Sequence, residues 1–156
     1  MCLQSKRSKI QRIRSDQYQI CLGNSRENGI RILQLTDQHM GKMGFWREDL
    51  RTLQRMKRLA EMYDPHLIAL TGDLLTGEKF FGDLLCAFVT HFFDSLELPW
   101  LYVFGNHDPE GGMSRDQIAE IFTASRWCVL GNHHDEGAGG RLRDDLDGQR
   151  KCNRCR

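Results

Sequence analysis

Residues 35–39 read Leu-Thr-Asp-Gln-His, and two later stretches follow the same plan: residues 70–73 read Leu-Thr-Gly-Asp, and residues 104–108 read Phe-Gly-Asn-His-Asp. Each stretch ends an apolar run with side chains that bind metal ions. The aspartates of the first two stretches are 36 positions apart, and the asparagine of the third lies 33 positions further on. This spacing suits parallel strands joined by helices. Because the carboxyl ends of parallel strands share one edge of a sheet, we expect the three stretches to meet there.

The rest of the sequence alternates between strand and helix patterns. Apolar residues recur at spacings of three and four over residues 48–62, which predicts an amphipathic helix. Ser114 and Gln117 form a capping-box pattern at the start of a later helix. The predicted elements are strands 17–22, 30–35, 67–70, 100–104 and 127–130 and helices 48–62, 83–96 and 114–125. Their order predicts an α/β layered fold, in which strands 30–35 and 67–70 are buried.

The two ends of the chain differ in character from its middle. Residues 1–16 are predicted to form a flexible basic N-terminus, residues 17–136 a single domain, and residues 137–156 a weakly structured charged tail. No apolar segment has the length of a membrane span, and the first residues lack the apolar core of a secretory signal, so we expect a cytoplasmic protein that does not bind membranes. The formal net charge of +1 gives no argument for a nucleic-acid partner.

The side chains at the predicted strand ends favour metal-dependent hydrolysis. Aspartate, histidine and asparagine offer oxygen and nitrogen ligands, a mixture that suits Mn, Fe or Zn better than Ca. A carboxylate that gives one oxygen to each of two ions lets the ions sit about 3.5–4 Å apart, where they clamp a phosphate and lower the pKa of a bridging water. The alternative is that each stretch is an ordinary helix cap or turn, which requires three independent coincidences.

The segments Asp37-Gln38-His39, Gly72-Asp73 and Gly105-Asn106-His107-Asp108 resemble, in this order, the first three motifs of the calcineurin-like metallophosphoesterases. Those motifs are Asp-x-His, Gly-Asp and Gly-Asn-His-Asp/Glu, and the resemblance covers residues 30–110. It implies the N-terminal half of a layered β-sandwich-type fold with flanking helices. It also implies a hydrolase for phosphate esters, either phosphomonoesters or phosphoproteins, that uses hydroxide activated by two metal ions.

The resemblance implies a metal-binding role for four residues. Asp37 and His39 would bind the first ion, and Asp73 would bridge both ions. Asn106 would bind the second ion through its side-chain carbonyl oxygen. The ions would be Mn, Fe or Zn, and the substrate would be a phosphate ester.

The resemblance also implies a catalytic pair and two glycines that the backbone needs. His107 would contact the phosphate and protonate or stabilise the leaving oxygen, while Asp108 would hold its imidazole in place. Gly72 and Gly105 would let the backbone turn tightly where a Cβ would crowd the site. Purple acid phosphatases usually have Gly-Asp-x-x-Tyr, with an iron-binding tyrosine. Thr76 stands at that position here, so we expect a colourless enzyme type.

Two later motifs of the family, an isolated histidine and Gly-His-x-His, are not recognisable after Asp108. His133 and His134 follow a predicted strand, but we interpret them as surface-loop residues. Cys152 and Cys155 form a single CxxC, short of the four ligands of a structural zinc site. The chain therefore looks truncated, and we expect weak metal binding and little or no hydrolysis.

Two classes of function remain open from the sequence. The chain is either the N-terminal portion of a phosphohydrolase or a non-catalytic relative that keeps half of the site for binding or structure. The sequence makes no prediction about the oligomeric state.

Overall fold

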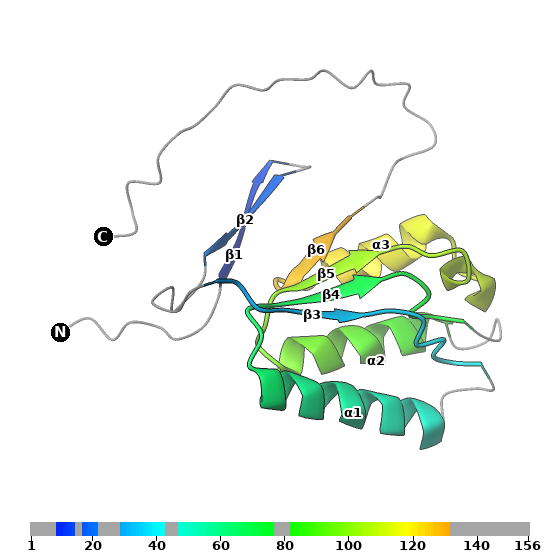
Figure 1. Ribbon diagram of the computed structural model, residues 1–156. Helices are drawn as coiled ribbons and strands as arrows, with labels where there is room; N and C mark the ends of the chain where they lie inside the picture. The colour runs from blue at the N-terminus through cyan, green and yellow to red at the C-terminus, as the bar shows by residue number, and fades with distance from the viewer. Residues whose placement is uncertain (1–8, 15–16, 22–28, 43–46, 77–81, 132–156) are drawn as a thin grey trace.

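Figure 1 shows a computed structural model of the chain, which describes residues 9–14, 17–21, 29–42, 47–76 and 82–131. Its centre is a sheet of four parallel strands in the order β3-β4-β5-β6. The strands span Ile32–Leu35 (β3), Leu67–Thr71 (β4), Trp100–Val103 (β5) and Cys128–Leu130 (β6). The strands have the same order in the sheet as along the chain. Neighbouring strands of the sheet are therefore consecutive in the sequence, with one α-helix between them.

Three helices join these strands and pack on one face of the sheet. They are α1 (Arg47–Tyr63), α2 (Gly82–Ser95) and α3 (Arg115–Thr123). The ring of Trp100 in β5 lies 5.4 Å from the ring of Phe93 in α2 and 5.4 Å from that of Phe122 in α3, between centroids. Leu53 and Met56 of α1 join the same buried core. The helices therefore cover one face of the sheet, and the site described below lies at the carboxyl ends of the strands.

The predicted α/β class and the order of these elements are confirmed. The helix predicted over 48–62 is α1, and the strands predicted over 67–70, 100–104 and 127–130 are β4, β5 and β6. The capping box before α3 is present. Ser114 Oγ accepts a hydrogen bond from the Gln117 backbone N–H at 3.2 Å, and Gln117 Oε1 accepts one from the Ser114 N–H at 2.8 Å.

The prediction that strand 30–35 is buried is wrong. Ile32 and Gln34 of β3 are exposed, while Leu33 and Leu35 pack against the core. The reason is position, since β3 is at the edge of the described sheet and the helices cover one face only. β4, which lies between two strands, is buried as predicted.

Part of the N-terminal segment also differs from the expectation. Within residues 1–16, Lys9–Arg14 forms strand β1, which pairs with β2 (Gln17–Cys21) as a separate antiparallel sheet. Ile10 stands opposite Ile20, but the register shifts between Arg12 and Arg14. This irregularity breaks the two-residue alternation by which a strand is recognised in sequence.

Several predictions fall on residues outside the described ranges. These are the charged tail over 137–156, the histidines His133 and His134, and the cysteines Cys152 and Cys155. Within the described part of the chain, no helix combines the length and the apolar character needed to cross a membrane.

Candidate metal centre

The loops that follow β3 and β4 run side by side beyond the ends of the strands. The backbone N–H of Asp37 donates to the Gly72 carbonyl at 3.2 Å, and the N–H of His39 donates to the Asp73 carbonyl at 2.9 Å. Further along, Met40 still pairs with the β4 loop. These bonds fix the two loops in register, so the Asp-x-His segment lies beside the Gly-Asp segment.

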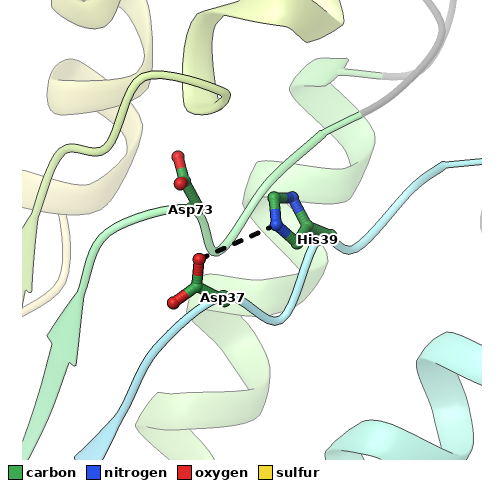
Figure 2. Close-up of side chains that lie close together, drawn as sticks. All are labelled: Asp37, His39 and Asp73. Atoms are coloured by element: carbon green, nitrogen blue, oxygen red, sulfur yellow. Dashed lines mark ion pairs between the residues drawn. The ribbon is translucent and has the colours of Figure 1, made fainter.

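Asp37, His39 and Asp73 form a cluster at this edge of the sheet (Figure 2). Each offers one ligand atom, and the three atoms lie within 4.8 Å of one another. His39 Nε2 is 3.8 Å from Asp37 Oδ1. The side chain of Asp37 is 60% exposed, so the cluster opens to solvent. The predicted meeting of the first two stretches is confirmed.

The backbone at all three residues adopts the left-handed conformation. The φ angles are +58° at Asp37, +47° at His39 and +53° at Asp73. A residue other than glycine in this region costs on the order of 1–3 kcal/mol when the surroundings hold it there, and such residues concentrate at functional sites. The hydrogen bonds between the two loops supply that restraint.

Gly72 and Gly105 bring the loops after β4 and β5 into close contact. Gly72 has a φ of +97°, and a Cβ there would lie 3.2 Å from the Cα of Gly105. A Cβ on Gly105 would overlap Oδ1 and the backbone nitrogen of Asp73. Any side chain at Gly105 would therefore displace the Asp73 carboxylate. The crowding predicted at both glycines is confirmed.

Asp108 connects the same two loops through hydrogen bonds to their backbones. It is 1% exposed, and its carboxylate accepts hydrogen bonds from the backbone N–H groups of Gly105 at 2.6 Å, Leu75 at 2.9 Å and Asp73 at 3.1 Å. Both carboxylate oxygens are thereby engaged. The sequence assigned the imidazole of His107 to Asp108, but in the structure Asp108 organises the backbone around the site.

His107 lies at the rim of the cluster and is held by Glu110. Its backbone N–H donates to Asp73 Oδ1 at 2.8 Å, and its ring stands edge-on to that of His39, with centroids 5.1 Å apart. Its Nδ1 is 2.6 Å from Oε1 of Glu110. Sequence reasoning missed Glu110. The available signal is Pro109, which favours a tight turn that carries residue 110 back over residue 107.

Asn106 is exposed in the loop after β5, between Gly105 and His107. The third stretch therefore reaches the same edge as the other two. No hydrogen bond of the Asn106 side chain is recorded within the described ranges, and its assignment as a metal ligand stays a prediction.

Beneath the cluster, Tyr102 of β5 is fully buried. Its hydroxyl has no hydrogen-bond partner among the residues that the structure describes. Burial and the nearby Asp108 carboxylate raise the pKa of Tyr102 far above its ordinary value. The Tyr102 hydroxyl therefore stays protonated and uncharged near the Asp108 carboxylate.

The donors that converge here fit a transition-metal ion. Two carboxylates and one imidazole are ligands that Mn, Fe and Zn accept. Ligands of such ions lie about 2.0–2.2 Å from the metal, which places ligand atoms up to about 4 Å apart. The observed cluster needs a small contraction to reach that geometry, and of its three residues Asp37 is exposed while His39 and Asp73 are partly buried.

The sequence profile of the calcineurin-like phosphoesterases matches residues 30–151, a span that contains all three stretches. The chain belongs to this family. The match extends past residues 30–110, the range that the motifs alone cover.

Individual relatives of this calcineurin-like phosphoesterase are distant. Phosphatase DCR2 of Saccharomyces cerevisiae is 30% identical in an alignment 110 residues long, which covers 61% of this chain and 19% of the relative. Probable inactive purple acid phosphatase 28 of Arabidopsis thaliana is 32% identical in an alignment 120 residues long, which covers 67% of this chain and 30% of the relative. The chain thus spans less than a third of the length of these curated relatives.

Among solved structures, the crystal structure of Pseudomonas putida nuclease MPE superposes with a TM-score of 0.47 at 22% identity. The superposition covers 65% of this chain and 47% of that one.

Proposed function

We propose that Asp37, His39 and Asp73 bind a metal ion and form part of the active site of a metal-dependent phosphoesterase. The observation that carries this proposal is the convergence of their three ligand atoms within 4.8 Å. Family membership supports a phosphate ester as substrate, and we propose a phosphomonoester or a phosphoprotein.

Each residue has a distinct task in this proposal. Asp37, His39 and Asp73 would hold a first ion, and Asp73 together with Asn106 would supply ligands for a second one. The His107 N–H holds one oxygen of Asp73 and so sets the direction of the other. Two bound ions would polarise the phosphate ester and supply a water of lowered pKa for attack on phosphorus. The imidazole of His107 meets the leaving oxygen, while Asp108 keeps the loops in place.

A second candidate is a relative that binds a metal ion without catalysis. The Arabidopsis relative carries the words "probable inactive" in its name. Within the described ranges, three His, Cys, Asp or Glu ligands gather at one point, fewer than two ions require. A single weakly held ion would then have a structural or binding role.

The test uses the full chain loaded with Mn²⁺. We expect weak, chelator-sensitive binding of Mn²⁺ by calorimetry, and at least about a tenfold loss of affinity in Asp73→Asn, since a ligand oxygen is removed. Glu61→Gln, which changes an exposed carboxylate on α1, is the matched control and keeps the wild-type affinity.

Hydrolysis of p-nitrophenyl phosphate then separates the two candidates. Binding with turnover that Asp73→Asn abolishes supports the phosphoesterase. Binding without turnover supports the non-catalytic role. Equal Mn²⁺ affinity in the wild type, Asp73→Asn and Glu61→Gln overturns both.

A further inference from the structure

The contact between Glu110 and His107 has a local geometric origin. Glu110 lies in the short 3₁₀ helix η1 (Asp108–Gly111), and His107 is the residue just before it. Side chains three positions apart stand directly above one another in a 3₁₀ helix. The Glu110 carboxylate therefore returns over the imidazole, with Oε1 2.6 Å from Nδ1.

The same carboxylate also reaches the loop after β4. Glu110 Oε2 accepts a hydrogen bond from the Thr76 hydroxyl at 3.2 Å. The Thr76 backbone N–H in turn donates to the Met40 carbonyl in the loop after β3, at 2.8 Å. Glu110 thus connects His107 to the loops that carry Asp37, His39 and Asp73.

Several contacts restrain the backbone of η1, the short helix that carries Glu110. Its backbone N–H donates to the His107 carbonyl at 3.0 Å, and Pro109 fixes φ at the start of η1. Asp108 is the first residue of η1, and its carboxylate accepts hydrogen bonds from three backbone N–H groups. Gly112, with a φ of +81°, ends η1. A side chain on such a backbone holds its partner in one orientation.

We infer that Glu110 is the positioning residue of His107. Nδ1–H of His107 donates to Glu110 Oε1, which fixes the ring and keeps this proton on Nδ1, so that a proton passed to a leaving oxygen comes from Nε2. No hydrogen bond at Nε2 is recorded within the described ranges, so this nitrogen is available to the substrate. The assignment of a leaving-group oxygen to Nε2 rests on the proposed function, whereas the proton on Nδ1 does not.

The first test reads the proton on Nδ1 without any activity. Long-range ¹H–¹⁵N spectra of the metal-free full chain, with His107→Gln for assignment, report which ring nitrogen carries the proton. We expect a proton on Nδ1 in the wild type and its loss from Nδ1 in Glu110→Ala. Glu110→Gln keeps an acceptor oxygen and retains it. Glu120→Ala removes an exposed carboxylate of α3 and is the control. An identical His107 pattern in the wild type and Glu110→Ala overturns the inference.

The second test separates positioning from general damage. Phenol is a poorer leaving group than p-nitrophenol and depends more on a correctly placed histidine. Because general acid catalysis contributes about 10²–10⁴-fold, we expect Glu110→Ala to lose at least about tenfold more turnover on phenyl phosphate than on p-nitrophenyl phosphate. Glu110→Gln restores most of that difference.

The outcomes distinguish this inference from the proposed function. A wild type without turnover argues against the phosphoesterase, and the proton on Nδ1 then decides the role of Glu110. A wild type with turnover, in which Glu110→Ala lowers both substrates equally, overturns the positioning role and leaves the phosphoesterase standing.

Discussion

At the scale of single residues, two neighbouring carboxylates have separate tasks. Asp108 is buried and receives three backbone N–H groups, whereas Glu110 is half exposed and contacts the imidazole of His107. Asp108 keeps the loops after β4 and β5 at the distance that the two glycines permit. The geometry of the Asp37, His39 and Asp73 cluster therefore depends on a residue outside that cluster.

Asp108→Asn is expected to destabilise the fold. The amide keeps one acceptor oxygen but turns an NH₂ group toward backbone donors, and the charge that strengthens all three hydrogen bonds is lost. We expect the free energy of unfolding to fall by about 2–4 kcal/mol, measured by urea denaturation. Glu120→Gln changes an exposed carboxylate and serves as the control. An Asp108→Asn loss no larger than that of the control contradicts the bracing role.

The sequence predicted the meeting of Asp37, His39 and Asp73, because strand-end position follows from the alternation of strands and helices. It did not predict which carboxylate holds His107. Residues 108 and 110 both lie within reach of residue 107 along the chain, and the 3₁₀ turn that selects the second one depends on the burial of the first. The left-handed backbone conformation at Asp37, His39 and Asp73 could not be predicted from the sequence either, because it depends on hydrogen bonds between two loops.

At the scale of elements, the parallel strands and their helices were predictable because each carries its own periodicity. The predictions that failed concern properties that depend on which strand lies beside another in the sheet. The exposure of Ile32 and Gln34 depends on β3 being an edge strand, and the sequence of β3 does not contain that information. β1 was missed because its partner and its register shift are needed to recognise it.

The start of α3 gives a prediction at this scale. Ser114 caps the helix, and Arg115 in its first turn donates to the Gly105 carbonyl at 3.2 Å, so the cap also fixes the loop beside Asp73. Ser114→Ala is expected to lower the free energy of unfolding by about 0.5–2 kcal/mol. Ser114→Asp keeps an acceptor and recovers most of it. Urea denaturation measures both variants, and equal stability of Ser114→Ala and the wild type contradicts the capping role.

At the scale of the whole molecule, one apolar core supports the site from one side of the sheet. The core holds an aromatic row from Phe93 through Trp100 and Phe122 to Tyr102, in which successive rings are in contact. From Tyr102 the contacts continue to Phe104, with ring centroids 4.9 Å apart, and Tyr102 lies near the buried Asp108 carboxylate. Burial of this column makes the Tyr102 hydroxyl difficult to ionise.

That burial predicts a loss of stability in alkali. Burial, with the Asp108 and Asp83 carboxylates as lesser causes, raises the pKa of the Cys86 thiol to about 12. Burial likewise raises the pKa values of Tyr102 and Cys128. In the unfolded chain the Cys86 thiol ionises near its ordinary value of 9.0, so above that pH the unfolded chain binds fewer protons than the folded one. Stability is therefore full below the unfolded pKa and falls as the pH rises toward the folded pKa.

The size of this effect can be measured on one thiol at a time. Urea denaturation between about pH 8 and about pH 11 is expected to show a fall of about 1.4 kcal/mol per pH unit for each group that ionises in the unfolded chain alone. Cys86→Ala removes one such group and makes the slope shallower by that amount, although its stability at neutral pH is lower. Cys21→Ala, on the partly exposed β2, is the matched control for loss of a thiol. If both variants keep the wild-type slope, the Cys86 thiol ionises equally in the folded and unfolded chains, and the core does not exclude charge as the structure requires.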